Sequence, residues 1–362
     1  MNKNNYCVIM AGGVGSRFWP MSKTKKPKQF IDVLGTGKTL LQQTFSRFEK
    51  ICPTENIYIV TSDIYNDVVK EQLPQITQNQ ILLEPDRRNT APCVAYANYK
   101  ILKQNPDAKI VVAPSDHLIL NESEFIKIIE QSFNFVAKND ALLTLGIKPN
   151  RPDTGYGYIQ IDKKIKPDNG VNKVKTFTEK PNLEMATFFV NSGEFYWNSG
   201  IFIWSLKSII KAFDEKLPEV NNLFKDGINI YDTPDEQNFI LKTYTSCKNI
   251  SIDYGIMEKS DNVYVLPSDF GWSDLGTWGS LYTHMNLDNN KNAIKGRQNV
   301  LTYDVKNSII HSSGDRLIVL QGLDDYIVVD TNETLLICKK QDEQKIKQIV
   351  NDIKINKGEN YI

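Results

Sequence analysis

The chain is poor in cysteine and histidine, with five cysteines and three histidines among 362 residues. The cysteines are scattered and none forms a C-x-x-C pair, which argues against a disulfide framework and against a zinc site. The formal net charge is zero, because 43 Lys and Arg residues balance 43 Asp and Glu residues. Without a basic excess we expect no nucleic-acid partner, and without an apolar run of membrane-spanning length we expect no membrane partner. These absences favour a cytoplasmic protein with free thiols.

Short apolar runs alternate with helical patterns over most of the chain. The runs at 57–60, 110–113 and 142–145 are apolar without alternation, which predicts strands buried on both faces of a parallel sheet. Between them, apolar residues recur on one helical face at 41–48 and 125–136. This order predicts an α/β fold with a mostly parallel, mixed sheet, whose ligands lie at the carboxyl ends of the strands.

The pattern changes after about residue 286. The stretch 287–292 is polar and predicts a linker. Five short strands without intervening helices follow it, at 300–303, 308–311, 317–320, 326–329 and 335–338. A final helix is predicted from apolar residues that share one face over 346–353. We therefore predict a first domain over 1–288 and a small β-rich domain over 289–362, whose strand spacing fits a short left-handed β-helix. We expect this second domain to mediate self-association or to brace the first.

The N-terminal region carries a loop with Gly12, Gly13 and Gly15, followed by Arg17 and Lys28. Glycines let backbone N–H groups approach a bulky anion closely. Arg and Lys add the positive charge that a triphosphate requires. The loop therefore predicts a binding site for a nucleoside triphosphate.

Two other glycine motifs do not fit this chain. In a dinucleotide-binding loop, G-x-G-x-x-G, the third glycine position would fall on Phe18. The segment Gly35–Thr39 reads Gly-Thr-Gly-Lys-Thr, but a P-loop needs a further glycine at the position of Asp32. The first loop is therefore the better candidate for phosphate binding.

Nine segments, taken together and in order, resemble the sugar-nucleotide pyrophosphorylases, and among them the bacterial mannose-1-phosphate guanylyltransferases. They are Ala11–Arg17, Pro27–Phe30, Glu84–Pro92, Pro114–His117, Gly155–Tyr158, Phe177–Pro181, Trp197–Gly200, Ser251–Tyr254 and Trp272–Gly276. The resemblance covers about the first 290 residues. It implies a Rossmann-like nucleotidyltransferase domain. Relatives that also isomerise mannose 6-phosphate carry a further C-terminal domain, for which we expect no room in this chain.

The reaction implied by the resemblance is attack of a sugar 1-phosphate on the α-phosphorus of GTP, which gives GDP-mannose and pyrophosphate. The nucleophile is already an anion near neutral pH, because the second pKa of a phosphate monoester is about 6. No side-chain base is required, so we expect positioning and charge stabilisation to supply the catalysis. The three histidines are expected to be structural.

The resemblance also assigns roles to single residues. Arg17 and Lys28 are predicted to bind the triphosphate. Asp116 and Asp274 are predicted to share one Mg²⁺, a hard cation that takes one or two carboxylates and keeps waters for its other positions. We count these four residues as the catalytic set.

The base and the sugar are assigned to further residues. Glu84 is the candidate reader of guanine, because a carboxylate can accept from both N1–H and the N2 amine. Asn89 would support the nucleotide. The sugar phosphate is expected to contact Gly157, Glu179, Lys180, Asn198 and Asp253.

Three alternatives stay open at this stage. The same chemistry on another sugar 1-phosphate, such as that of heptose, fucose or glucose, would use the same motifs, and so would the same reaction with another base. A non-catalytic nucleotide-sugar sensor would share the fold, although it would have no need to keep the metal carboxylates. We expect a homodimer from the β-rich domain.

Overall fold

The computed structural model describes residues 1–362, apart from the side chain of residue 297. It divides into two compact units, and neither is one continuous segment. The first unit contains Met1–Gly12, Thr44–Ser115 and Ile119–Trp272. The second unit contains Gly13–Gln43, Asp116–Leu118 and Ser273–Ile362. The glycine-loop segment therefore packs with the C-terminal region, which the sequence did not predict. The linear domain boundary near residue 288 stays a prediction.

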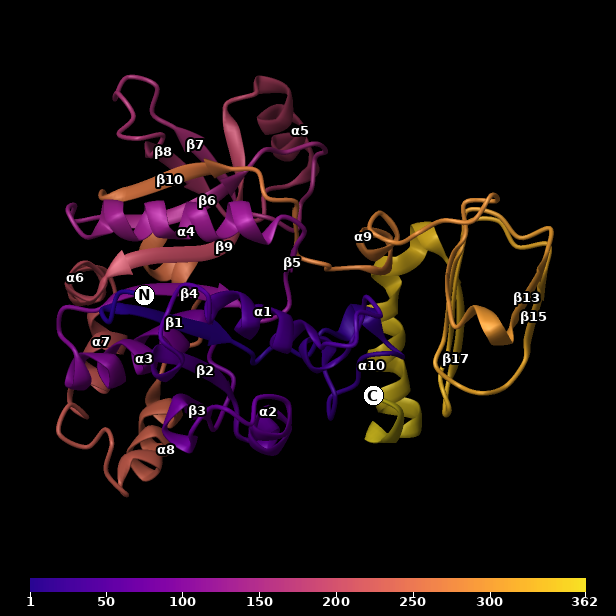
Figure 1. Cartoon of the computed structure of the whole chain (residues 1–362), viewed down its shortest axis with the longest axis horizontal. Helices are drawn as coiled ribbons and strands as arrows, with labels where there is room; N and C mark the ends of the chain where they lie inside the picture. Colours follow the sequence, from indigo (N-terminus) through magenta and orange to yellow (C-terminus); the bar gives the residue numbers. More distant parts are fainter. The chain divides into compact units, whose positions relative to one another are not determined.

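A nine-stranded mixed sheet forms the centre of the first unit (Figure 1), with the order β3-β2-β1-β4-β9-β6-β10-β8-β7. Its strands are β1 (Asn5–Met10), β2 (Ile57–Ser62), β3 (Ile81–Glu84), β4 (Lys109–Pro114), β6 (Leu142–Ile147), β7 (Tyr158–Ile161), β8 (Asn172–Thr178), β9 (Phe195–Ser205) and β10 (Val263–Ser268). The pairings make every strand of this sheet except β8 and β9 run in the same direction. This confirms the predicted mostly parallel, mixed sheet.

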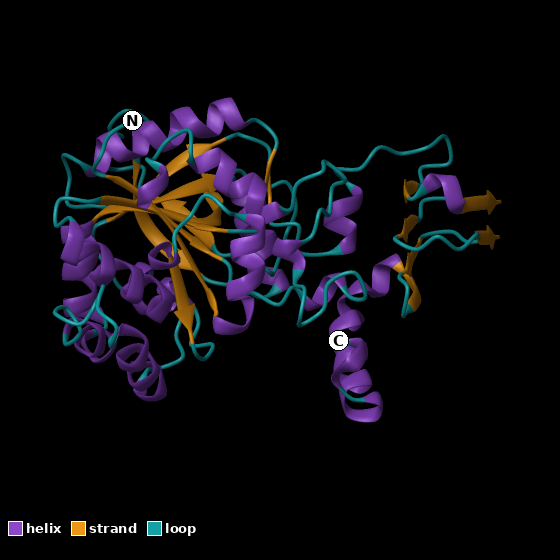
Figure 2. Cartoon of the chain, turned by 60° about the horizontal axis from the view of Figure 1, so that its bottom comes forward, coloured by secondary structure: helices purple, strands orange, loops and turns teal.

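Helices cover both faces of this sheet (Figure 2). Those of the first unit are α2 (Asn66–Gln72), α3 (Thr90–Gln104), α4 (Glu122–Val136), α5 (Leu183–Ser192), α6 (Leu206–Lys216), α7 (Pro218–Lys225) and α8 (Glu236–Ser246). Helix α1 (Leu40–Phe48) begins in the second unit and ends in the first, and the short strands β5 (Leu118–Ile119) and β11 (Trp272–Ser273) also lie where the chain passes between units. Helix α3 is the most buried helix, because Ala91–Ile101 lies entirely in the core beside Tyr6 and Val8 of β1.

The second unit stacks short strands that pair in parallel, except that the last strand pairs antiparallel with the one before it. They are β12 (Ala293–Lys295), β13 (Val300–Tyr303), β14 (Ile309–Ser312), β15 (Ile318–Gln321), β16 (Tyr326–Asp330) and β17 (Leu335–Lys339), with helices α9 (Trp278–Tyr282) and α10 (Ile346–Lys357). Ala293 pairs with Ile309, and Ile309 pairs with Ile327, all in parallel. Parallel strands that stack at steps of 16 to 18 residues confirm the β-helix-like prediction.

The core of the second unit joins the glycine-loop segment to the β-rich region. Phe18, Trp19 and Val33 pack in one cluster with β-strand residues such as Ile327 and with Ile346 of α10. The indole N–H of Trp19 also donates to the carbonyl of Tyr361, at 2.7 Å. The C-terminal strands and helix therefore support the segment that carries Arg17 and Lys28.

The polar stretch at 287–292, which was predicted as a linker, is an ordered turn. Asn292 is fully buried and donates to Asp288 and to the carbonyl of Val305. The carboxylate of Asp288 accepts from the backbone N–H groups of Asn290 and Asn292. The polar residues of this stretch hydrogen-bond to one another inside the unit. Their polarity alone did not predict this arrangement.

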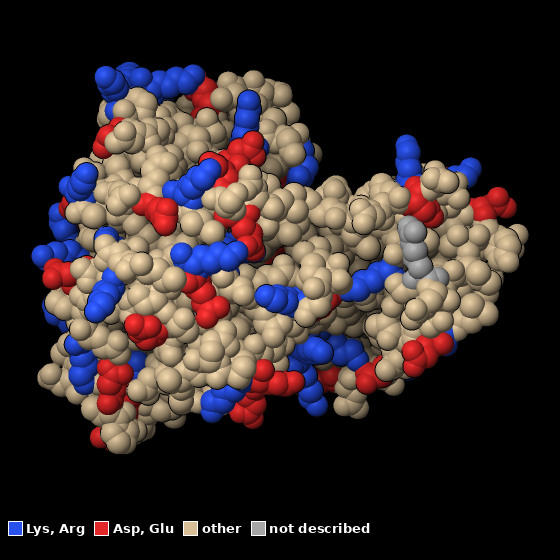
Figure 3. All heavy atoms as spheres, viewed as in Figure 1, with Lys and Arg blue, Asp and Glu red and all other residues tan. Residues whose placement is uncertain are grey.

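The distribution of surface charge and the state of the cysteines agree with what the composition predicts. On the face shown in Figure 3, Lys and Arg are interspersed with Asp and Glu, and neither sign forms a continuous field. The five cysteines are free, as predicted, and four of them are buried. Among the described residues, none of the helices has the length and apolar character that a membrane span needs.

Candidate active site

Gly15 gives the glycine loop its close approach to Lys28. Its φ of 62° lies in the left-handed region, and a Cβ added there would stand 2.8 Å from Cβ of Lys28. Any larger residue would therefore be strained in its backbone and would also displace the lysine. Ser22 and Gln29 fix the loop by donating to the carbonyls of Gly15 and Gly13.

The ammonium of Lys28 is buried and fully hydrogen-bonded. It donates to Oδ2 of Asp116 at 2.8 Å, to the carbonyl of Asp274 at 2.8 Å and to the carbonyl of Leu275 at 3.0 Å. Its side chain is only 4% exposed. Because an ammonium has three donors, Lys28 in this conformation has none left for a phosphate. It links the carboxylate of Asp116 to the backbone of Asp274, which lies 158 positions later in the sequence.

The turn at Asp274–Gly276 carries backbone strain. Leu275 is fully buried and has a φ of 44°, a left-handed conformation that a bulky residue rarely adopts. Strain of this kind persists where surrounding contacts enforce it, and it gathers at functional sites. Here it turns the carbonyl of Leu275 towards Lys28, while Oδ1 of Asp274 accepts from the N–H of Gly276.

Arg17 reaches the same turn. Its Nη1 lies 3.4 Å from the carbonyl of Gly276, a long hydrogen bond, and the residue is exposed. A Cβ on Gly276 would stand 2.5 Å from Oδ2 of Asp274 and 3.3 Å from Nη1 of Arg17. The second unit therefore brings Arg17, Lys28, Asp116 and Asp274 together. Of its two cations, Arg17 is the one with donors available to a ligand.

The carboxylates of this cluster fit a magnesium ion. Burial would raise the pKa of Asp116, but the charges of Lys28 and of nearby His117 outweigh it and hold that pKa below its usual range. Asp116 is therefore ionised at neutral pH, as a metal ligand must be. No group of three or more His, Cys, Asp or Glu suited to a metal occurs among the described residues. Mg²⁺ needs only one or two protein carboxylates when phosphates and waters complete its shell.

The rejected P-loop segment has a different role. The backbone N–H groups of Gly35 and Thr36 donate to Oδ1 of Asp32, at 2.8 and 2.9 Å, and the N–H of Gly37 donates to Oδ2 at 2.8 Å. Successive N–H groups that point inward bind an anion. In this loop that anion is the chain's own Asp32 carboxylate, so the segment does not have the open cradle of a phosphate loop.

The predicted base reader, Glu84, lies at the carboxyl end of β3 and is only 8% exposed. Tyr244 of α8 donates its hydroxyl to Oε1 at 2.9 Å. A Cβ on Gly12 would stand 3.3 Å from Oε2, so the glycine leaves this oxygen uncrowded. Burial raises the pKa of Glu84 to about 7, against the opposing effects of Tyr244 and Arg87. The sequence did not single out Tyr244, because no motif marks a residue 160 positions away.

Asn89 acts as a cap in this structure. It has a φ of 70°, which asparagine tolerates better than most residues, and its Oδ1 accepts from the N–H of Thr90 at the start of α3. Thr90 in turn accepts from the N–H of Ile252, at 2.9 Å. These bonds join the region after β3 to the segment that carries Asp253.

Glu179 and Gly157 are in close contact. A Cβ on Gly157 would stand 2.4 Å from Oε2 of Glu179, so only glycine fits there. That oxygen is buried and has no hydrogen-bond partner among the described residues. The other oxygen pairs with Lys180, whose pKa burial would lower but whose bond to Glu179 raises it. An unpartnered buried oxygen of this kind suits a ligand hydroxyl as donor.

Asn198 orients Asp253 beside these residues. Its Nδ2 donates to Oδ1 of Asp253 at 2.9 Å, and its Oδ1 accepts from Thr144 at 3.0 Å, which fixes the amide. Burial, and then the charge of Glu179, raise the pKa of Asp253 to about 7. The first unit therefore brings together all five residues predicted for the sugar phosphate.

An aromatic and cationic group beside Gly157 was not predicted. The guanidinium of Arg151 stands 5.1 Å from the ring of Trp197 and 5.9 Å from the ring of Tyr156. Asp153 holds it with a bond of 2.8 Å. Tyr156 also packs edge-on against Trp272 at 5.3 Å. Tyr156 and Trp197 also pack edge-on against each other at 5.0 Å, so the arginine lies against a packed pair of rings.

Comparisons with known proteins agree with these observations. The family described as "Nucleotidyl transferase" matches residues 6–291, and the one described as "MannoseP isomerase/GMP-like beta-helix domain" matches residues 298–353. Mannose-1-phosphate guanylyltransferase 2 of Escherichia coli O157:H7 is 36% identical over 98% of this chain and 74% of its own length. The alginate biosynthesis protein AlgA of Pseudomonas aeruginosa is 35% identical over 96% of this chain and 71% of its own length.

A solved structure from Thermus thermophilus, described as a mannose-1-phosphate geranyltransferase, has a TM-score of 0.86 at 26% identity. The similarity covers 97% of this chain and 99% of that chain. Fold, site and family match together define a nucleotidyltransferase. Within that class, the chain belongs to the family of the mannose-1-phosphate guanylyltransferases.

Proposed function

We propose that the chain transfers GMP from GTP to mannose 1-phosphate, giving GDP-mannose and pyrophosphate. The observation that carries this proposal is the cluster at the Asp274–Gly276 turn, which gathers two cations and two carboxylates in one place. This is the set that a triphosphate and a magnesium ion require. The names of the relatives, at 33–36% identity over most of the chain, support the choice of guanine and mannose.

The chemistry follows from the charges of the substrates. The phosphate of mannose 1-phosphate attacks the α-phosphorus in line, and pyrophosphate leaves from the opposite side. Arg17 binds phosphate oxygens with its available donors. Lys28 binds a phosphate oxygen by giving up one of its three present acceptors. Asp116 and Asp274 would hold Mg²⁺, which when bound neutralises charge on the phosphate oxygens.

The base and the sugar use the first unit. Ionised Glu84 accepts the two adjacent donors of guanine, with Tyr244 holding its carboxylate in place. Asn89 supports the nucleotide through its side-chain amide. The unpartnered oxygen of Glu179 accepts from a mannose hydroxyl, and Lys180 pairs with the sugar phosphate.

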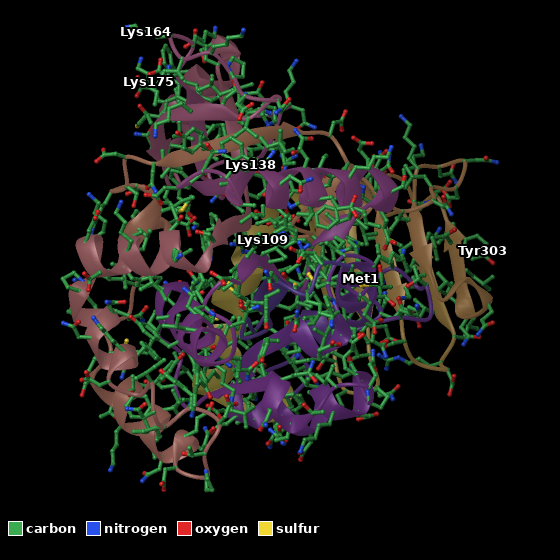
Figure 4. All side chains as sticks on the ribbon, turned by 60° about the vertical axis from the view of Figure 1, so that its left-hand side comes forward. Met1, Lys109, Lys138, Lys164, Lys175 and Tyr303 are labelled. Atoms are coloured by element: carbon green, nitrogen blue, oxygen red, sulfur yellow. The ribbon has the colours of Figure 1, made fainter. Side chains whose placement is uncertain are left out.

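We further propose a cytoplasmic homodimer. Strands β13 and β15, together with Leu317 just before β15, present an exposed apolar face made of Leu301, Tyr303, Leu317 and Val319, which are 47–64% exposed. Leu301 and Val319 are register partners, so the face is continuous, and Tyr303 is labelled on it in Figure 4. A contiguous apolar face of this kind is typical of a protein interface.

The test is pyrophosphate release over a grid of GTP, ATP, UTP and dTTP against several sugar 1-phosphates. We expect GTP with mannose 1-phosphate to be the best pair. Equal turnover with another nucleotide would refute the base assignment, and better turnover with another sugar phosphate would refute only the sugar. A sensor without catalysis would bind GDP-mannose and release no pyrophosphate with any pair.

A further inference from the structure

The loop at 151–157 leads into β7 and ends in the turn Gly155–Gly157. Gly157 is one of the residues expected to contact the sugar phosphate. Four of the seven residues of this loop are exposed, so little apolar burial holds its shape. The conformation of the turn in the absence of a ligand therefore depends on the hydrogen bonds made within the loop.

Asp153 makes those bonds through its side chain and through its backbone. Its Oδ1 accepts from the N–H of Gly155 at 2.9 Å, and its Oδ2 accepts from the guanidinium of Arg151 at 2.8 Å. Its backbone N–H donates to the hydroxyl of Tyr158 at 3.0 Å, and the same hydroxyl donates to its carbonyl at 3.0 Å. Tyr158 is fully buried in the core of the first unit, so these bonds anchor the exposed loop to that core.

The turn held by Asp153 sets the positions of two residues of the sugar site. A Cβ on Gly157 would stand 2.4 Å from Oε2 of Glu179, so this oxygen packs directly on the glycine backbone. The carbonyl of Gly157 accepts from the N–H of Asn198 at 2.8 Å. Gly157 is only two residues after Gly155, so a movement of the turn would displace the surface on which Glu179 rests.

We propose that Asp153 is a positioning residue of the sugar site, which fixes the turn for a sugar 1-phosphate by holding the N–H of Gly155. This inference rests on the proposed function, and Asp153 acts through the backbone of the turn. A turn that is ordered before the ligand arrives saves the entropy cost of ordering it on binding. Loss of the bond should therefore weaken binding of the sugar phosphate and leave binding of the nucleotide unchanged.

The experiment compares Asp153→Ala with the matched variant Asp162→Ala. Oδ1 of Asp162 accepts from the N–H of Lys164 at 3.0 Å, across the same spacing of two residues, in the loop that follows β7. Both aspartates are partly exposed. The control therefore removes an equivalent bond from a loop that carries none of the residues predicted for the sugar phosphate.

The expected result is a selective change in one Michaelis constant. In Asp153→Ala the KM for mannose 1-phosphate should rise about tenfold, while kcat and the KM for GTP change by less than about twofold. Asp153→Asn keeps an acceptor oxygen for Gly155, so its KM should return to within about threefold of the native value. Asp162→Ala should leave all three constants unchanged. The Kd for mannose 1-phosphate from calorimetry should follow its KM.

Equal rises in KM for both substrates, or a lower kcat at unchanged KM, would show that Asp153 serves only the fold and would overturn the proposal. A rise in Asp162→Ala as large as that in Asp153→Ala would do the same, and so would an Asp153→Asn variant no better than Asp153→Ala.

Failure of the proposed function would give a different result. If another sugar 1-phosphate is the better substrate of the native chain, it replaces mannose 1-phosphate in every measurement. A native chain that releases no pyrophosphate would refute the proposed function, and calorimetry would still decide the role of Asp153. A Kd about tenfold higher in Asp153→Ala than in Asp162→Ala would support positioning, and equal values would overturn it.

Discussion

The raised pKa of Glu84 predicts a specific dependence of stability on pH. Burial raises this pKa from 4.5 to about 7 in the folded chain. A carboxyl group whose pKa is higher in the folded chain than in the unfolded chain stabilises the folded state when it is protonated. This stabilisation is complete below the pKa of the unfolded chain and is lost as the pH rises through 7. Between about pH 4.5 and pH 7, ionisation of Glu84 should therefore lower the free energy of unfolding of the ligand-free protein by a growing amount.

The size of the penalty follows from the shift. A change of 2.5 units corresponds to about 3 kcal/mol, because each unit is worth about 1.4 kcal/mol. In Glu84→Gln this contribution is absent at every pH. The amide still accepts from Tyr244 with its oxygen, and the cost of its NH₂ group beside Gly12 does not change with pH. Part of this penalty is already present at pH 5, so the variant should gain about 2–3 kcal/mol on the native protein between about pH 5 and pH 8.

The assay is thermal melting of both proteins at pH 5, 6, 7 and 8 without nucleotide. At roughly 2–4 °C per kcal/mol for a domain of this size, the difference in Tm should grow by roughly 6 °C or more in favour of the variant. Glu71→Gln, an exposed position on α2, serves as the control and should keep a constant difference. Parallel pH profiles for the native protein and Glu84→Gln would refute the buried, titrating carboxylate.

Three other outcomes are expected. In Glu84→Gln the preference for GTP over ATP should fall by about tenfold or more, with KM affected more than kcat; an unchanged ratio would remove Glu84 from the base site. Asp116→Asn and Asp274→Asn should each lose at least about a hundredfold in kcat, or about 2.7 kcal/mol, and a near-native rate in either would show that its residue is not a metal ligand. Asp116→Asn should also lower the Tm, because it removes the charge that pairs with the buried ammonium of Lys28, whereas Asp274→Asn should change the Tm little. Truncation before Asn292 removes the strands that pack on Phe18, so it should lower the melting point or the mass in solution. It should not reduce activity unless one of these two properties also changes. Unchanged mass and Tm with lost activity would contradict that role.

Local patterns predicted the elements of this fold closely. The strands expected at 300–303 and 326–329 occur at Val300–Tyr303 and Tyr326–Asp330. The helical face expected over 346–353 is the face of α10 that packs on the core. Such patterns depend only on neighbours in the sequence, which is why they can be interpreted without a structure. The motifs also named residues that gather at each cluster, although Asn198 lies inside β9 and Asp253 begins a short helical segment.

Local sequence patterns did not predict contacts between distant segments. Lys28 is the example with the largest consequence for the proposed function. A lysine that closely follows Lys26 in a basic, polar stretch appears from sequence to be an exposed phosphate ligand. Its actual surroundings depend on Asp116 and on a turn 246 residues later, where the left-handed backbone of Leu275 brings a second carbonyl within 3.0 Å. Because all three of its donors are used, any contact between Lys28 and a phosphate must replace an existing bond. Under the proposed function, a phosphate that binds Lys28 displaces either the carboxylate of Asp116, which is a proposed metal ligand, or a carbonyl of the Asp274–Leu275 turn.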